Sequence, residues 1–326
     1  MKIPPNYKIT QEIISLISQI ETQRNILSSL QIPPDLKEKI QRISLLQSSL
    51  FSARIEGNPL KIEEIEHTPN EKKKIEIFNL VKASQYIEKK IKSSQNITKN
   101  IILDLHQIVM KDIGVWGIRD EPGAIFDSAG MVVYLPPLPN EISSLLSNLF
   151  DYINSQQETF PLVKTLISHL VFEKIHPFID GNGRVGRLLI FAILKSADFN
   201  FSLTVPFEKY LDEHESQYYS HLDNGLTNPE DYLLFMLKAI YEETKNLISQ
   251  IGNEIGKDKD LYLLPPRQEE IYLIVKDHVF VSFDDLRRRF ARVPERTLRY
   301  DLKKLQEKNL LVKTGKTKGS FYKIHR

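Results

Sequence analysis

Cysteine is absent from this 326-residue chain, which excludes disulfide cross-links and thiolate chemistry. No stretch approaches the ~18 consecutive apolar residues of a membrane span, so we expect no membrane partner. The first residues, MKIPPNYKITQE, have no apolar core after the lysine and are not typical of a signal peptide. The sequence also lacks a GxxxxGK[ST] motif, which excludes a P-loop enzyme. These absences favour a cytoplasmic protein whose chemistry comes from other side chains.

The charge is unevenly distributed along the chain. The formal net charge is only +2, but residues 266–326 hold 16 Lys and Arg against 8 Asp and Glu, a local net charge of +8. The preceding residues hold 28 against 34, a net charge of −6. Such a division predicts two domains with different partners, and the basic one is a candidate for binding nucleic acid.

Apolar residues at three- and four-residue spacing predict that most of residues 1–250 is helical, as in 12–27 and 162–175. One segment departs from this pattern. Residues 123–139, GAIFDSAGMVVYLPPLP, carry two short β-branched or aromatic runs around DSAG at 127–130 and predict a β-hairpin. We therefore expect a mainly α fold with one hairpin in this part of the chain.

The C-terminal part has a different organisation. Residues 251–265 lose the helical spacing and end at the pair Pro265-Pro266, so we interpret them as a linker. The rest contains three short helical patterns and two short strands around a Gly- and Lys-rich tip, the outline of a winged helix-turn-helix domain. Ser282 can cap its second helix, and Pro294 suits the first turn of its third. The expected parts are an N-terminal helical region (1–100), a core (101–250), the linker (251–265) and the winged helix-turn-helix domain (266–326).

The run HPFIDGNGRVGRLL, residues 176–189, concentrates several reactive residue types. Pro177 disfavours helical geometry at His176, so we expect a helix to end just before it. Gly181 and Gly183 allow a tight turn and a close approach to a ligand. A second helix is then expected to begin near residues 183–184, with apolar residues that anchor it in the core.

Read as chemistry, this run predicts transfer from a nucleoside triphosphate to an alcohol. The free N–H groups of the second helix form an anion site, and Arg184 and Arg187, three apart on one face, can clamp phosphates. Asp180 can hold a magnesium ion, and His176 can take the proton of an attacking hydroxyl. The alternatives are a structural turn and an ordinary solvated arginine face. A structural turn has no use for all these groups together, so we favour the catalytic interpretation.

The run also resembles the signature HxFx[D/E]GNGRxxR of the Fic family. The residues that fill its specified positions are His176, Phe178, Asp180, Gly181, Asn182, Gly183, Arg184 and Arg187. The resemblance covers roughly residues 40–250 and implies a Fic-type helical bundle. It implies AMPylation, in which AMP moves from ATP to a Ser, Thr or Tyr hydroxyl of a protein and diphosphate is released. It implies His176 as general base, Asp180 as the Mg²⁺ ligand, and Gly181, Asn182, Gly183, Arg184 and Arg187 as ATP phosphate contacts.

Two further segments are similar to parts of Fic proteins. The hairpin at 123–139 resembles the Fic flap, which lines the nucleotide site and pairs with an extended target segment, and this implies Ile125 as an ATP contact. The segment SQYYSHL, 216–222, is similar to the one whose tyrosine packs near the adenine. We assign Tyr218 there, with Tyr219 as the alternative. An ordinary surface hairpin and a core aromatic pair are the competing interpretations.

A second motif, SARIEGN, closes a long helical pattern with a glycine suited to the C′ position. It matches the Fic inhibitory motif [S/T]xxxE[G/A]N at Ser52, Glu56, Gly57 and Asn58. The resemblance implies an inhibitory helix at about 42–57 whose Glu56 pairs with Arg187 inside the ATP site. An arginine held by Glu56 cannot hold the terminal phosphate, and the carboxylate repels the triphosphate.

Basic residues gather on the third helix and the wing of the C-terminal domain. Their spacing predicts neutralisation of DNA phosphates, with a solvated basic surface or a protein-contact module as the alternatives. The candidate DNA contacts are Arg296, Arg299, Lys303, Lys304, Lys316 and Lys318.

The leading hypothesis is an autoinhibited protein adenylyltransferase that uses ATP and Mg²⁺ on a target protein, this chain itself included. The alternatives are a Fic-fold enzyme with another donor (UMP, phosphate or phosphocholine), a de-AMPylase, or a DNA-binding regulator whose Fic domain senses nucleotide. The oligomeric state stays open, with a homo-oligomer among the alternatives. His106, His169 and His221 show no ligand-like grouping and are interpreted as structural, and Trp116, the single tryptophan, as a core residue.

Overall fold

The computed structural model describes residues 1–65, 71–126, 132–255, 264–278, 280–315 and 321–325. The fold is mainly α, as predicted, and divides into two compact units. The first unit contains residues 1–31 and 39–250, and the second contains residues 32–38 and 251–326. The N-terminal region and the core expected from the sequence thus lie together in the first unit.

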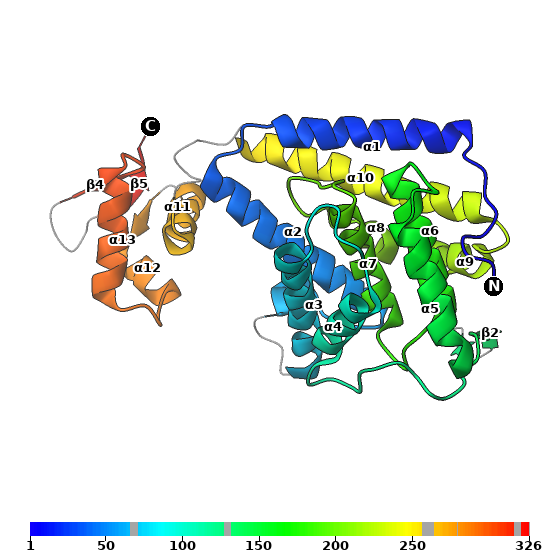
Figure 1. The fold of residues 1–326 in the computed structure, drawn as a ribbon. Coiled ribbons are helices and arrows are strands. Elements are labelled where there is room, and N and C mark those ends of the chain that lie inside the picture. The colour runs from blue at the N-terminus through cyan, green and yellow to red at the C-terminus, as the bar shows by residue number, and fades with distance from the viewer. Residues whose placement is uncertain (66–70, 127–131, 256–263, 279, 316–320, 326) are drawn as a thin grey trace. The chain divides into compact units, whose positions relative to one another are not determined.

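The first unit is a helical bundle (Figure 1), and residues 34–38 of α2 and 251–255 of α10 are counted with the second unit. Its helices are α1 (Gln11–Ser29), α2 (Pro34–Ile55), α3 (Glu71–Lys90), α4 (Lys99–Met110), α5 (Pro139–Asn154), α6 (Pro161–Ile175), α7 (Asn182–Ser196), α8 (Glu208–Glu213), α9 (Glu215–Asn224) and α10 (Pro229–Ile255), with one 3₁₀ turn, η1 (Ile62–Glu64). A two-stranded antiparallel pair, β1 (Ile125–Phe126) and β2 (Val132–Tyr134), lies between α4 and α5.

Helix α6 lies at the centre of this bundle. Nearly all of its side chains are buried, from Leu162 to Ile175, which is the pattern of a helix covered on every face. It packs against α5 on one side and α7 on another, while α3 and α4 also contact α7. The junction between α6 and α7 is therefore held in the core of the unit.

The helix ends near the predicted motifs follow local signals. Helix α2 ends at Ile55, where Gly57 has φ +82°. The Gly57 N–H donates to the Arg54 carbonyl at 2.8 Å, and the Asn58 N–H donates to the Ala53 carbonyl at 3.0 Å. These two bonds form the Schellman motif, so the glycine is at C′ as the sequence predicts. The helix itself begins at Pro34, eight residues before the predicted inhibitory helix.

Two other predicted boundaries differ from the structure. Helix α10 continues to Ile255, five residues into the segment interpreted as a linker, because Leu247 and the fully buried Ile251 extend its apolar face at four-residue spacing. Helix α7 begins at Asn182, one residue earlier than expected. The hairpin is formed by β1 and β2 as predicted, whereas its turn at 127–130 lies outside the described residues.

The second unit has the predicted helices and one strand more than predicted. Its elements are α11 (Pro266–His278), β3 (Val281–Ser282), α12 (Phe283–Arg289), α13 (Glu295–Glu307), β4 (Leu311–Thr314) and β5 (Phe321–Ile324). The strands form an antiparallel sheet in the order β3-β5-β4. Ser282 and Asp285 form a capping box at the start of α12, and Pro294 directly precedes α13. Among the described residues, every helix is too short or too polar to cross a membrane.

Candidate active site

The loop that carries the motif begins at the end of α6. His176 follows the helix in the left-handed region, at φ +48°, and Gly181 turns the chain again at φ +82° to start α7. Between them, the Asn182 side chain donates to the Phe178 carbonyl and accepts from the Phe178 N–H, both at 2.8 Å. The asparagine predicted as a phosphate contact therefore fixes the shape of the loop.

The His176 ring is neutral and largely buried. Burial lowers its pKa below the usual 6.5, although the Glu173 carbonyl and the Glu56 carboxylate oppose this shift. Nδ1 is buried and makes no hydrogen bond of normal geometry among the described residues. A neutral imidazole with an unpaired nitrogen can accept a proton, as a general base must.

Arg119 holds the backbone of the same loop, and no sequence pattern indicated it. Its guanidinium donates to the carbonyls of His176 at 2.8 Å, Glu121 at 2.9 Å and Pro137 at 2.6 Å. Its own N–H donates to the Pro177 carbonyl at 2.9 Å, and the side chain is buried. The residue thus joins the His176 loop to the segment that follows β2.

Arg187 is buried against the end of α2. Its Nε donates to the Ser52 hydroxyl at 2.9 Å, and one terminal nitrogen donates to the Ser52 carbonyl at 2.8 Å and to Glu56 Oε1 at 2.9 Å. Burial is the largest influence on the pKa of Arg187 and would lower it, but Glu56, Tyr218, Tyr219 and Glu173 together outweigh burial and raise the pKa. The arginine is only 1% exposed, so Glu56 is its principal charged partner in this structure.

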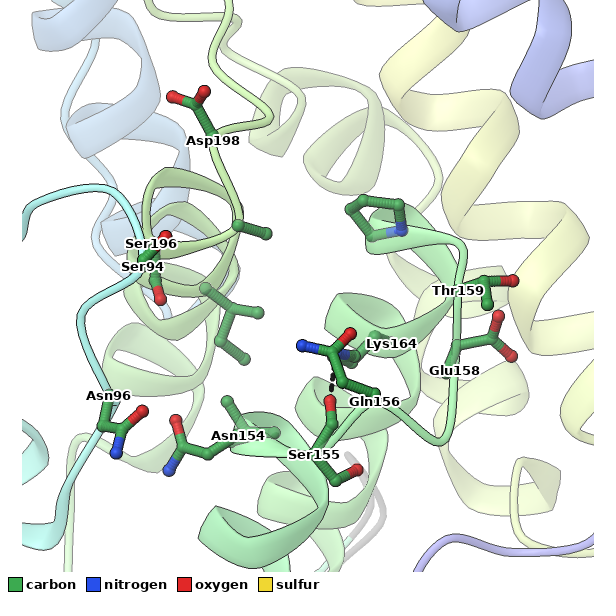
Figure 2. Close-up of a pocket in the computed structure, with 14 residues that line it drawn as sticks. Ser94, Asn96, Asn154, Ser155, Gln156, Glu158, Thr159, Lys164, Ser196 and Asp198 are labelled. Carbon is green, nitrogen blue, oxygen red and sulfur yellow. Dashed lines mark hydrogen bonds between the residues drawn. The ribbon is translucent and has the colours of Figure 1, made fainter.

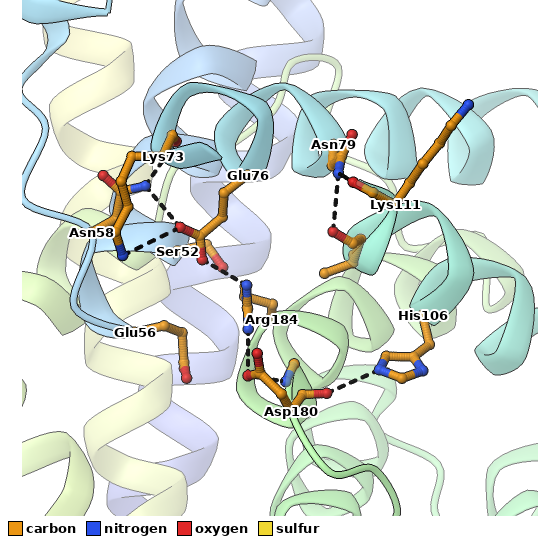
Figure 3. Close-up of polar contacts among 12 residues, drawn as sticks. Ser52, Glu56, Asn58, Lys73, Glu76, Asn79, His106, Lys111, Asp180 and Arg184 are labelled. Atoms are coloured by element: carbon orange, nitrogen blue, oxygen red, sulfur yellow. Dashed lines mark hydrogen bonds and ion pairs between the residues drawn. The ribbon is translucent and has the colours of Figure 1, made fainter. Parts of the chain in front are cut away.

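Arg184 is held by a different acid. It donates to Glu76 Oε1 and to Asp180 Oδ1, both at 2.6 Å. Glu76 in turn accepts a hydrogen bond from Asn58 at 2.9 Å, and Figure 3 shows it between the two. Both motif arginines are therefore linked to the SARIEGN segment, Arg187 through Glu56 and Arg184 through Asn58. Glu76 is a second residue that the sequence analysis missed.

The Glu56 carboxylate also occupies the start of α7. A Cβ atom placed on Gly183 would lie 2.3 Å from Glu56 Oε1, so only a glycine permits this approach. The first hydrogen bond within α7 runs from Val185 to Gly181, which leaves the N–H groups of residues 182–184 without a partner inside the helix. A carboxylate at this position is where the helix terminus favours an anion.

Two buried groups behind Arg187 are neutral. Burial raises the pKa of Glu173 to about 8 and lowers the pKa of His169 to about 3. Their contact, 3.6 Å between Glu173 Oε1 and His169 Nε2, therefore joins uncharged groups at pH 7 and is not an ion pair. His169 also bonds the Tyr232 hydroxyl at 2.6 Å, which agrees with its interpretation as structural.

Asp180 was predicted to hold a magnesium ion. Its side chain is 61% exposed beside the start of α7, and its Oδ1 accepts from Arg184 and from the Gly181 N–H. The described residues contain no group of three acids or histidines that could complete a metal site on their own. A single exposed carboxylate fits a magnesium ion whose other ligands are phosphate oxygens and water.

The predicted adenine and flap contacts are less accessible than expected. Tyr218 is 1% exposed, with its hydroxyl 3.4 Å from His169 Nε2, so burial favours the alternative, Tyr219. Tyr219 is 39% exposed and donates to the Ile55 carbonyl at 2.9 Å. Ile125 is half-buried in β1 and pairs with Tyr134. The ATP contacts of these residues stay predictions.

Two aromatic residues near the loop have distinct positions. The His106 ring stacks on Phe178 at 3.7 Å, its Nδ1 accepts from the Gly117 N–H, and its Nε2 bonds the Asp180 carbonyl at 2.9 Å. Because Nδ1 accepts, Nε2 must carry the proton, and the ring fixes the loop as a neutral donor. Trp116, interpreted as a core residue, is instead 51% exposed; that interpretation was wrong, since a lone aromatic residue has no periodicity to place it.

Half of the candidate DNA contacts are paired with acids of their own helix. Arg299 pairs with Glu295, and Lys303 and Lys304 pair with Glu307. Arg296 is exposed, while Lys316 and Lys318 lie outside the described residues. Exposed pairs of this kind are weak, so they do not prevent phosphate binding, and DNA contact stays a prediction.

A polar cavity of about 300 Å³ lies at the other end of α7 (Figure 2). Its lining includes Glu158, Lys164 and Ser196. Lys164 donates to the Ser155 carbonyl, and Glu158 accepts from the Tyr7 hydroxyl, so both charged groups are already bonded. Since α7 has 15 residues, about 22 Å separate its two ends. The cavity is therefore distinct from the motif loop, where the reactive groups converge.

Comparisons with known proteins find relatives of this chain. Residues 96–194 match the model of the Fic/DOC family. A probable protein adenylyltransferase of Aquifex aeolicus is 28% identical over 51% of this chain and 52% of its own length. A protein adenylyltransferase Fic of Drosophila mojavensis is 24% identical over 67% of this chain and 45% of its own length. The chain thus spans about half the length of the curated relatives it matches.

A solved structure shows the same fold. The crystal structure of a Fic family protein from Desulfovibrio desulfuricans G20 superposes with a TM-score of 0.70, at 21% identity, and covers 98% of both chains. At this identity the likeness extends to the fold and not to the reaction.

Proposed function

On the premise that residues 96–194 belong to the Fic/DOC family, we propose that this chain is a protein adenylyltransferase that Glu56 holds in an inhibited state. The names of the curated relatives support the activity. The observation that carries the inhibited state is the position of Glu56, bonded to Arg187 at 2.9 Å and seated over Gly183 at the start of α7.

The proposed reaction moves AMP from ATP to a Ser, Thr or Tyr hydroxyl. The hydroxyl oxygen forms a bond to the α-phosphorus while the bond from that phosphorus to the bridging oxygen breaks. Diphosphate leaves with the bond electrons, and the hydroxyl proton passes to the neutral His176 ring. The buried ring suits this role because its lowered pKa keeps it unprotonated at pH 7.

The phosphates would bind at the α6–α7 junction. The N–H groups of Gly183 and its neighbours and the guanidinium groups of Arg184 and Arg187 provide the positive charge there. Asn182 keeps the loop in shape through its two bonds to Phe178. Asp180 would hold the magnesium ion, which supplies neutralisation of phosphate charge when bound.

Inhibition follows from competition for the same groups. Glu56 and a terminal phosphate cannot both occupy the position beside Arg187 and Gly183, and the carboxylate repels an approaching anion. A charge-assisted hydrogen bond of this kind contributes about 1.5–3 kcal/mol, so its loss would raise the labelling rate about ten- to a hundredfold at limiting ATP.

The test uses Glu56→Gly protein, with Glu63→Gly as a matched control, because Glu63 is an exposed acid of the neighbouring η1 turn. Each protein is incubated with magnesium and ATP labelled at either the α- or the γ-phosphate, and adducts are read by intact mass. We expect α-label on protein with Glu56→Gly, little with the control, and none with Glu56→Gly/His176→Ala.

Each alternative predicts a different result. If only the γ-label were transferred, the reaction would be phosphorylation and not adenylylation. Equal α-labelling by wild type and Glu56→Gly would contradict the inhibitory role of Glu56. Unchanged labelling after His176→Ala would contradict the assignment of His176 as the general base. Adduct on the chain itself, rather than on an added protein, would identify self-modification.

A further inference from the structure

Five apolar side chains are exposed around the loop that joins α6 to α7. Val115, Leu135 and Ile179 are the three most exposed large hydrophobic side chains of the described residues, at 75%, 69% and 66%. Trp116 and Leu138 are also more than half exposed. Single exposed apolar residues are ordinary, but a group of them beside a reactive loop marks an interaction surface. We refer to these five residues as the apolar rim.

One side of the apolar rim is fixed to the loop. Segment 115–119 runs antiparallel to 177–179, because Ile118 pairs with Phe178. The His106 ring strengthens this pairing by bonding the backbone of both segments, at Gly117 and Asp180. The exposed side chains on these segments therefore stand on a backbone that is already ordered, which lowers the entropic cost of binding.

The other side is fixed by Arg119 and Tyr134. The Arg119 guanidinium bonds the carbonyls of both His176 and Pro137, which brings segment 135–138 beside the histidine. The Tyr134 hydroxyl donates to the Lys174 carbonyl in the last turn of α6 at 3.0 Å. Apolar side chains thus lie on two segments that are both bonded to the backbone around the proposed base.

The charges near the apolar rim restrict what can bind there. Asp112, Asp120 and Glu121 are exposed on both sides of segment 115–119, next to one exposed cation, Lys111, whereas Arg119 is buried and bonded. This acidic border disfavours nucleic acid and anionic lipid. It favours a polypeptide that carries basic side chains outside an apolar stretch.

We propose that the apolar rim docks the target polypeptide, with apolar side chains on both sides of the acceptor hydroxyl packed against it. Lys or Arg further along the target faces the acidic border. This inference rests on the proposed transfer to a protein hydroxyl and adds the sequence class of the target.

The docking step is measured without transfer. Trp116 is the only tryptophan of the chain and is half exposed, so its fluorescence reports burial of the apolar rim. The probe is a synthetic peptide with a central serine, leucines on both sides and lysines at both ends. We expect a blue shift on titration in the absence of ATP, and none with a peptide in which the leucines are replaced by serines.

The transfer step uses Glu56→Gly protein with α-labelled ATP. Adding Ile179→Ser or Leu135→Ser is expected to raise KM for the leucine peptide roughly tenfold, since each change removes most of the transfer free energy of one apolar side chain. The values of kcat and of KM for ATP should stay unchanged. The matched control is Ile14→Ser, which removes an exposed apolar side chain of α1 and should leave all three values unchanged.

The outcomes separate this inference from the proposed function. Docking without AMP transfer to any protein or peptide would support the apolar rim and contradict adenylylation. Transfer with equal efficiency to both peptides, or with KM unaffected by Ile179→Ser and Leu135→Ser, would overturn the inference and leave the activity standing. A Trp116 shift that depends on protein concentration without peptide would assign the surface to a second copy of the chain and overturn it as well.

Discussion

Replacing Glu76 by glutamine removes its buried ion pair with Arg184, together with a longer pair to the partly exposed Lys73 at 3.9 Å. Both oxygens of Glu76 accept hydrogen bonds, Oε1 from Arg184 at 2.6 Å and Oε2 from Asn58 at 2.9 Å. Glutamine offers one carbonyl oxygen and one NH₂ group, so one of the two donors would face another donor. Asn58 cannot rotate its amide to compensate, because that amide also donates to the Lys73 carbonyl and accepts from Leu60.

The expected cost follows from burial. The side chains of Arg184 and Glu76 are 5% and 8% exposed, so little solvent can replace the lost partner. Breaking a buried pair by removing one charge costs about 3–5 kcal/mol, and the remaining hydrogen bond to glutamine recovers part of it. We expect Glu76→Gln to lower the free energy of unfolding by about 2–4 kcal/mol.

Urea unfolding followed by Trp116 fluorescence measures this loss, because the single tryptophan lies in the first unit and reports on that unit. The matched control is Glu88→Gln on the same helix, α3. Glu88 pairs with Lys195 at 2.8 Å but is 76% exposed, so its loss should cost less than about 1 kcal/mol. Equal unfolding midpoints for the two variants would refute the reasoning that burial decides the value of these pairs.

Two further predictions concern the glycines and the pH dependence. Gly186→Ala should destabilise the chain by about 1–3 kcal/mol, because the new Cβ would lie 1.9 Å from buried Glu173 Oε1. Gly252→Ala, with open space at its Cβ in α10, should stabilise by about 0.5–1 kcal/mol, and thermal melting by circular dichroism checks both signs. In Glu56→Gly protein, the labelling rate should stay constant from pH 8 to 6.5 and fall only below the usual histidine range. Burial already lowers the pKa of His176, and removing Glu56 lowers it further; a rate that halves above pH 6.5 would contradict this.

The features that the sequence predicted depend on short-range signals. Pro177, Gly181 and Gly57 each determine a chain turn within a few residues of themselves, and the structure has a helix end at each of them. The capping box of Ser282 is similarly local. Steric and hydrogen-bond preferences of this kind act wherever the residue stands, so they can be read without knowing the fold.

The residues that were missed act across the chain. Glu76 meets Arg184 over a separation of 108 residues, and Arg119 meets the His176 carbonyl over 57. Within its own helix or loop, neither residue differs from an ordinary surface charge. Only the packing of α3 against α7, and of the 119 segment against the loop, brings them to their partners. Trp116 was misplaced for a different reason, because a lone aromatic residue has no periodicity that indicates burial.

The turn after α2 places Glu56 and Asn58 on the two sides of one glycine, and each leads to a different motif arginine. A pull on the end of α2 would consequently disturb both connections together. Because Glu56 and Asn58 are separated by one residue, a movement that releases Arg187 from Glu56 also displaces the Asn58 contact that supports Arg184 through Glu76. We therefore expect both arginines to be released together. Any signal that moves this short segment therefore acts on Arg184 and Arg187 together.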